Sequence, residues 1–204
     1  GHDSAIGLAG DFPDEVRRGF ALQDAGNQIM RLLGGRSVHP VGLKIGGFHH
    51  APAMAEAEAL LERLTALLPE AEQMCRWLAT IDLPEEEQVF TSVALTGAAY
   101  PIEQGELISS QGLRILPEQY DQHFTEHQVQ HSTALWSLLE GKDYLVGPLA
   151  RLNLNHALLP PQIQSLLTEL GKPFPSRNMF HSMLARGVEV LFALTEAISI
   201  LQKY

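Results

Sequence analysis

The stretch Phe180–Leu201, FHSMLARGVEVLFALTEAISIL, decides the fold. Its apolar residues recur at every third or fourth position, which is the spacing of one face of an α-helix. The stripe consists of Phe180, Met183, Leu184, Gly187, Leu191, Leu194, Ile198 and Leu201. Because Ser176 or Asn178 can cap the start, the pattern predicts a helix over about 177–203. Helices well above the usual length of about 10–14 residues are typical of multi-helix bundles.

Two more long helices are predicted nearer the N-terminus. Pro13 suits the first turn of a helix, since its missing N–H would be unpaired there. That helix covers about 13–33, and the pair Gly34-Gly35 ends it. A second one follows over about 53–81, again with apolar residues at helical spacing. We expect a break at Pro69, because proline removes a helical hydrogen bond.

The only good strand signals lie in the middle of the chain. Gln88–Leu95 alternates and is rich in β-branched residues, and two further short segments flank the turn Gln111-Gly112. This pattern predicts a small antiparallel β element around 88–116. Helical spacing returns over about 148–170 in two short segments. The chain is thus expected to be mainly α, a multi-helix bundle with one small β element, without a linker that divides residues 1–204.

Composition excludes some classes of function. The net charge is −10 and only 14 residues are basic, so a general nucleic-acid binder is not expected. No apolar run reaches the roughly 18–20 residues of a membrane span. The single cysteine, Cys75, cannot form an intramolecular disulfide, which favours a reducing compartment and a cytoplasmic protein.

Gly34–His50, GGRSVHPVGLKIGGFHH, could be a phosphate-binding loop or a structural joint. It lacks the Gly-Lys-Ser/Thr ending of a P-loop, and no G-x-G-x-x-G stands between a strand and a helix. On the structural interpretation, Gly34 and Gly35 end a helix in left-handed conformations, and Gly46 and Gly47 permit a tight approach.

His123, His127 and His131 recur at every fourth residue and could form a zinc-binding face of a helix. However, Phe124 stands where an H-E-x-x-H motif has glutamate, so a polar, partly exposed face is the alternative. His49-His50 can be a chance pair at the end of a loop. No G-x-S-x-G motif, the usual setting of a catalytic serine in α/β-hydrolases, is present. Cys75 is most simply a small buried apolar residue. The residues alone therefore assign no catalytic, cofactor-binding or metal-ligating residue.

Two longer strings carry a resemblance to a known family. Gly34–Pro40, followed by Gly46–Phe48, and later Tyr144–Asn153 resemble the large (alpha) subunit of nickel–iron hydrogenases, especially the cytoplasmic, cofactor-coupled group. Smaller matching features are Tyr100-Pro101, Gly105, Glu126, His131-Ser132, Ala185-Arg186 and Glu189.

That resemblance implies an oxidoreductase of large and small subunits that splits or makes dihydrogen. In the family, four cysteines from two C-x-x-C motifs hold the nickel–iron centre, since soft thiolates suit these metals. This sequence has one cysteine and no C-x-x-C. It is therefore expected to be the central fragment of a large subunit, as its start at Gly1 also suggests, with no cofactor of its own and no activity alone.

The resemblance also implies a role for the glycine-bracketed loop. In the family its histidine faces the iron–sulfur small subunit, so His39, with Arg36 nearby, is a candidate for the subunit interface. A histidine there can tune a cluster by hydrogen bonding or charge. The alternative is a buried His39 that only orders the loop.

Two other classes of function stay open: a complex I-type relative that has lost the metal cysteines, and a non-catalytic helical interaction module. As a fragment of a large subunit, the chain is expected to expose apolar surface that the complete enzyme covers, and such surface favours self-association of the fragment.

Overall fold

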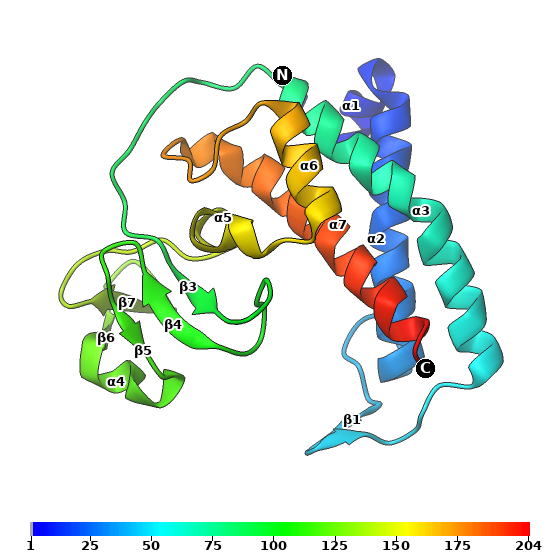
Figure 1. The fold of residues 1–204 in the computed structure, drawn as a ribbon, viewed down its shortest axis with the longest axis horizontal. Coiled ribbons are helices and arrows are strands. Elements are labelled where there is room, and N and C mark those ends of the chain that lie inside the picture. Colours follow the sequence, from blue (N-terminus) through cyan, green and yellow to red (C-terminus); the bar gives the residue numbers. More distant parts are fainter. Residues whose placement is uncertain (1) are drawn as a thin grey trace. The chain divides into compact units, whose positions relative to one another are not determined.

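The computed structural model describes residues 2–204, which form two compact units, 2–81 with 187–204, and 82–186. About half of the chain is helical, so the predicted mainly α fold is confirmed (Figure 1). The α-helices are α1 (Ala5–Asp11), α2 (Pro13–Gly34), α3 (Met54–Thr80), α4 (Tyr120–His123), α5 (Pro148–Asn155), α6 (Pro161–Leu170) and α7 (Ser182–Leu201). Short 3₁₀ turns cover Pro117–Gln119, His156–Leu158 and Met179–His181.

The first unit is built on α2 and α3, which lie side by side and antiparallel (Figure 1). Their shared core contains Ala25, Ala57, Leu60, Leu64, Ala71 and Cys75. α7 contacts α3 closely at Gly187, where an added Cβ would lie 2.7 Å from Leu78 Cδ1 and 3.6 Å from Cys75 Sγ. Glycine is thus required at this contact for the two helices to approach.

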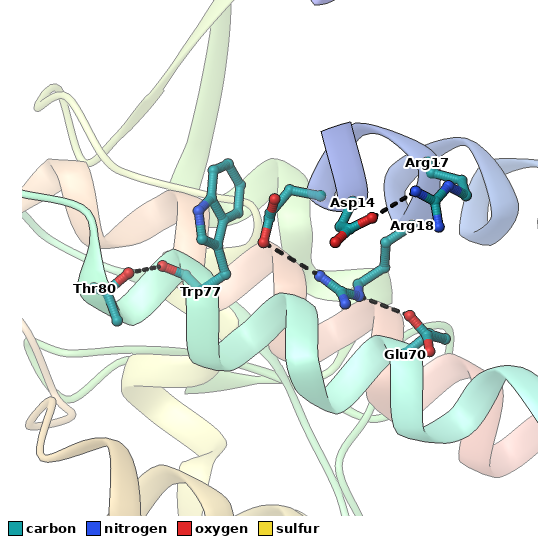
Figure 2. Close-up of polar contacts among 7 residues, drawn as sticks. Asp14, Arg17, Arg18, Glu70, Trp77 and Thr80 are labelled. Atoms are coloured by element: carbon teal, nitrogen blue, oxygen red, sulfur yellow. Dashed lines mark hydrogen bonds and ion pairs between the residues drawn. The ribbon is translucent and has the colours of Figure 1, made fainter. Parts of the chain in front are cut away.

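An ion pair also joins α2 to α3 (Figure 2). Arg18 Nε lies 2.8 Å from a carboxylate oxygen of Glu70, and Arg18 Nη1 lies 3.7 Å from Glu15 on its own helix. The Arg18 side chain is only 15% exposed. Close by, the ring centroids of Phe12 and Trp77 lie 5.7 Å apart. Arg18 therefore links α2 to α3 from a largely enclosed position.

The expected break at Pro69 is wrong, because α3 continues through it. Proline inside a helix costs about 3 kcal/mol or more. Leu60 and Leu64 are buried before Pro69, and Ala71 and Cys75 are buried after it. Burial of this one apolar face along the whole helix offsets the lost hydrogen bond.

The second unit contains the predicted β element. The strands β3 (Val93–Thr96), β4 (Glu106–Ser109) and β5 (Arg114–Ile115) form an antiparallel sheet in the order β3-β4-β5. β6 (Phe124–Gln128) and β7 (Leu135–Leu139) form a separate antiparallel hairpin, which the sequence did not predict. Val93, Ile115, Phe124 and Leu139 form a common buried cluster of these strands.

His123, His127 and His131 do not lie together on one helix. His123 ends α4, His127 lies in β6 opposite Trp136, and His131 follows in the turn, with its ring edge-on to Trp136 at 5.3 Å. Phe124 and Leu139, which pair across the two strands, are buried, and the rest of β6 is exposed, so the segment is a hairpin held to the core at this one apolar pair. The zinc-binding helical face is therefore absent, and residues 2–204 hold no cluster of three metal-ligating side chains.

Candidate functional site

The segment Gly34–His50, here the 34–50 loop, begins where α2 ends. Gly35 is the left-handed residue after the helix, with φ of 77°, and its N–H donates to Arg31 O at 2.9 Å. Gly34 is not left-handed, contrary to the sequence prediction, but is the last helical residue. A Cβ on Gly34 would lie 2.5 Å from Cβ of Pro40, so glycine is needed there for close packing.

The loop folds back onto the end of α2. The N–H groups of Val41 and Gly42 both donate to Gly34 O at 2.9 Å. Gly42 has no room for a side chain, since its Cβ would lie 2.6 Å from Leu33 O. His49 N–H then donates to Gly42 O at 2.8 Å. These bonds fix the backbone of the loop at both of its ends.

Between these ends lies a small hairpin of β1 (Leu43–Lys44) and β2 (Gly47–Phe48). Gly46 and Gly47 have φ of 82° and 151°, and nothing lies within 4 Å of a Cβ built on either. The predicted tight approach at these two glycines is therefore wrong. They are needed for the positive φ of the turn.

The 34–50 loop presents apolar side chains outward. Val38 and Val41 are more than 60% exposed, and Ile45 at the hairpin tip is fully exposed. Leu43 and Phe48, which face each other in the hairpin, are also exposed. A fixed backbone with several outward apolar side chains is typical of a surface that meets another protein.

The two candidate residues of the sequence lie together on this loop. Nε–H of Arg36 donates to the backbone oxygen of His39. His39 has φ of 50°, a left-handed conformation that is uncommon for a residue other than glycine. Both side chains are exposed. The alternative of a buried, loop-ordering His39 is therefore wrong.

The second matching string, Tyr144–Asn153, lies inside the other unit. Leu145 bonds to both neighbours of Ser92: its N–H donates to Thr91 O at 2.7 Å, and its oxygen accepts from Val93 N–H at 2.8 Å. Gly147, with φ of 94°, then leads into Pro148 at the start of α5. The string thus joins β3 to α5, which is a structural role.

At the end of this string, Asn153 anchors a segment that the sequence did not single out. Its side-chain amide donates to Ser176 O at 2.8 Å and accepts from Ser176 N–H at 2.7 Å. Ser176 Oγ lies 2.7 Å from His181 Nδ1 and also accepts from Asn178 N–H at 3.1 Å. Burial, with the nearby Lys172 charge, lowers the pKa of His181.

This network positions the chain before α7. Ser176 is 6% exposed, and its hydroxyl is engaged by Asn178 N–H and by His181 Nδ1. Of the two expected caps, Asn178 acts as one, because its side chain accepts from Phe180 N–H at 2.9 Å at the start of the last 3₁₀ turn. The one signal of this network in the sequence was that Ser176 and Asn178 are residue types that cap helices.

Cys75 does not fit a thiolate ligand of nickel or iron. It is fully buried in α3, and this burial, helped by Glu72, raises the pKa of its thiol to about 12. A metal-bound cysteine must be deprotonated, and one thiol cannot supply a four-thiolate set.

The curated relatives that match are hydrogenase subunits. The chain is 27% identical over 206 residues to the alpha subunit of sulfhydrogenase 1 of Pyrococcus furiosus, a match that covers 100% of this chain and 48% of that relative. It is 27% identical over 194 residues to the alpha subunit of sulfhydrogenase 2 of the same organism (95% and 45%). It is also 27% identical over 210 residues to one subunit of the F420-non-reducing hydrogenase vhc of Methanococcus voltae (91% and 44%). No family model matches the chain.

The fold is shared with a solved chain as well. The crystal structure of an NAD⁺-reducing [NiFe]-hydrogenase in the H₂-reduced state matches with a TM-score of 0.75 and 20% identity. The match covers 97% of this chain and 49% of that one.

The helical first unit and the β-containing second unit are thus those of a hydrogenase large-subunit fold. The chain is homologous over its whole length to the large (alpha) subunits of nickel–iron hydrogenases and spans about half the length of the relatives it matches. In the part that the structure describes, no helix combines the length and hydropathy of a bilayer span.

Proposed function

We propose that this chain is the central part of the large subunit of a hydrogenase, and that its 34–50 loop docks an iron–sulfur small subunit in the cytoplasm. The observation that carries the proposal is the loop itself. Its backbone is held to the end of α2 by two hydrogen bonds to Gly34 O, while Val38, Val41 and Ile45 stay exposed. A preorganised apolar surface loses little entropy when a partner covers it.

His39 is the residue of this surface proposed to face the cluster. Its side chain is exposed, and its own backbone is in the left-handed region. Arg36 Nε–H donates to its carbonyl oxygen. An imidazole near a cluster can donate a hydrogen bond to a sulfur atom, which raises the reduction potential. Arg36 acts through His39 by fixing its backbone.

In this proposal the hydrogen chemistry belongs to the full-length parent, whose nickel–iron centre needs thiolates that residues 2–204 do not supply. The chain alone is then not catalytic. We expect elemental analysis of the purified chain, after removal of any affinity tag, to find no stoichiometric nickel or iron. One tightly bound nickel or iron per chain would contradict this part of the proposal.

The docking role is tested in the two-subunit complex that contains this sequence. Val38→Asp should weaken retention of the small subunit by about ten-fold or more, because it places a charge in an apolar contact. Val89→Asp is the matched control, since Val89 is 83% exposed but lies outside the loop. Equal retention in both variants would exclude the loop as the docking surface.

His39 is tested in the same complex. His39→Ala should leave the two subunits bound to each other and shift the cluster potential, with a loss of about 10- to 100-fold in hydrogen oxidation. His50→Ala is the control, because His50 is an exposed histidine in the same loop. An unchanged potential in His39→Ala would contradict its cluster-facing role.

A complex I-type relative is the second candidate, favoured by the presence of one cysteine and no C-x-x-C. The parent open reading frame distinguishes the candidates. C-x-x-C motifs on both sides support the hydrogenase, and their absence in a full-length, partner-bound chain supports the complex I relative. A natural start near Gly1 would support a separate helical interaction module.

A further inference from the structure

The hairpin of β1 and β2 at the tip of the 34–50 loop has two different faces. Leu43 pairs with Phe48 across the two strands, and Lys44 pairs with Gly47. Paired residues point to the same side of a hairpin, and neighbours along a strand point to opposite sides. Leu43 and Phe48 therefore share one face, and Lys44 lies on the other.

Both faces and the turn of this hairpin are exposed in the unit that contains them. Leu43, Lys44 and Phe48 are exposed, and Ile45 at the turn is fully exposed. In Figure 1 the hairpin projects beyond the adjoining ends of α2 and α3. It thus presents an apolar face, a cationic face and an apolar tip at the same time.

Lys44 has no carboxylate to pair with in this part of the chain. The residue opposite it, Gly47, has no side chain, and Lys44 forms no ion pair with the residues that the structure describes. No Asp or Glu occurs between Asp24 and Glu56. Both of these acids are already engaged, since Asp24 pairs with Arg63 at 2.6 Å and Glu56 bonds to the backbone at the start of α3.

This unpaired charge constrains any partner that covers the hairpin, an argument that rests on the proposed docking of a small subunit on the 34–50 loop. Burial of a charge without a counter-charge is costly, and an opposing carboxylate offsets that cost. Because residues 25–55 contain no carboxylate, the partner is its source. A flat surface cannot cover the apolar face and the cationic face together, since they point in opposite directions.

We propose that the hairpin inserts into a groove of the small subunit that has one apolar wall and one acidic wall. The apolar wall packs against Leu43 and Phe48, the floor of the groove receives Ile45, and a carboxylate on the other wall pairs with Lys44. The acidic wall also adds specificity, because a groove with a cation in that place would repel Lys44.

The first test is zero-length carbodiimide cross-linking of the two-subunit complex that contains this sequence. The reagent joins an amine to a carboxylate only where the two are in direct contact, and mass spectrometry of the peptides locates the link. We expect Lys44 to be joined to an Asp or Glu of the small subunit. Lys142, an exposed lysine of the other unit, measures the background. A link from Lys44 to another part of the large subunit, or no link at all, would overturn the proposal.

The second test measures the rate at which the small subunit dissociates. Lys44→Glu should raise this rate by about ten-fold or more, because loss of an enclosed charge pair acts mainly on dissociation. Lys44→Arg keeps the charge and should stay close to the unchanged complex. Lys142→Glu is the control for an exposed charge outside the loop, and circular dichroism checks that each variant is folded.

Val38→Asp in the same assay separates the two proposals. If Val38→Asp speeds dissociation and Lys44→Glu does not, the loop docks the small subunit but the acidic wall is absent. If neither variant changes the rate, docking by the loop fails as well. Either result would overturn the groove, whereas faster dissociation in both variants, with Lys44→Arg unchanged, supports it.

Discussion

Pro40 occupies the space in which a side chain on Gly34 would begin. A Cβ built on Gly34 lies 2.5 Å from Cβ of Pro40 and 3.5 Å from its Cα. The carbonyl of the same glycine accepts two hydrogen bonds from the returning loop. Packing and hydrogen bonding at one residue thus fix where the exposed 34–50 loop leaves α2.

Gly34→Ala tests this contact. We expect it to lower the free energy of unfolding by about 1–2 kcal/mol, since overpacking costs about 1–3 kcal/mol against a helix-propensity gain of at most about 1. Gly26→Ala is the matched control in the same helix, with nothing within 4 Å of its Cβ. Urea unfolding should show Gly26→Ala to be stabilising. Equal shifts in the two variants would show that Pro40 yields freely.

Arg18→Ala tests the link between α2 and α3 (Figure 2). We expect a loss of about 1–2 kcal/mol, because the variant removes packing and leaves Glu15 and Glu70 without their partly enclosed partner. Arg17→Ala removes a 75% exposed residue that pairs with Asp14, and should change stability by less than about 0.5 kcal/mol. The measurement is the urea midpoint of each variant. Similar losses of stability in the two variants would mean that the enclosed position of Arg18 does not strengthen its ion pairs.

The Cys75 thiol should be unreactive in the folded chain. Burial raises its pKa to about 12, so the thiolate needed for reaction is absent at pH 8. We expect a thiol reagent to label Cys75 only in urea. In the unfolded chain the thiol ionises near its ordinary value of 9.0, so stability is full below that pH and is lost as pH rises toward 12.

Cys75→Ala separates this effect from other alkaline titrations. The variant should show a smaller fall in stability between about pH 9 and 10.5 than the unchanged chain does. Rapid labelling without urea would contradict the buried position of the thiol.

His181 should make the chain less stable in acid. Burial and the charge of Lys172 lower its pKa, so the unfolded state binds a proton more readily than the folded state. The contribution of His181 is therefore full above its ordinary value of 6.5 and is lost as pH falls below it. Protonation also changes the bond between Nδ1 and Ser176 Oγ.

The measurement is the urea midpoint at pH 7 and pH 5. His181→Gln should reduce the difference between the two pH values, whereas His50→Gln, on an exposed histidine, should leave it unchanged. An identical pH dependence in all three proteins would remove His181 as its source.

Local patterns predicted the regular parts of the fold. The stripes of α2 and α7 and the alternation around β3 depend on residues a few positions apart, which the sequence states directly. The predicted C-terminal glycine of α2 is also local, although only Gly35 is left-handed. The β6–β7 hairpin was missed because the histidine spacing imitates a helical period.

By itself, the sequence determined a mainly helical chain, its small β element, and the two strings that resemble the large subunit of a hydrogenase. Only the tertiary structure decided that Pro69 lies within one helix, that Gly34 must be glycine and that His39 is exposed. The reason is that each of these depends on a neighbour distant in sequence or on a folded-back loop. Burial of a whole helix face can outweigh one lost hydrogen bond, and a proline ring six residues away can exclude a methyl group. No periodicity in the chain records either effect.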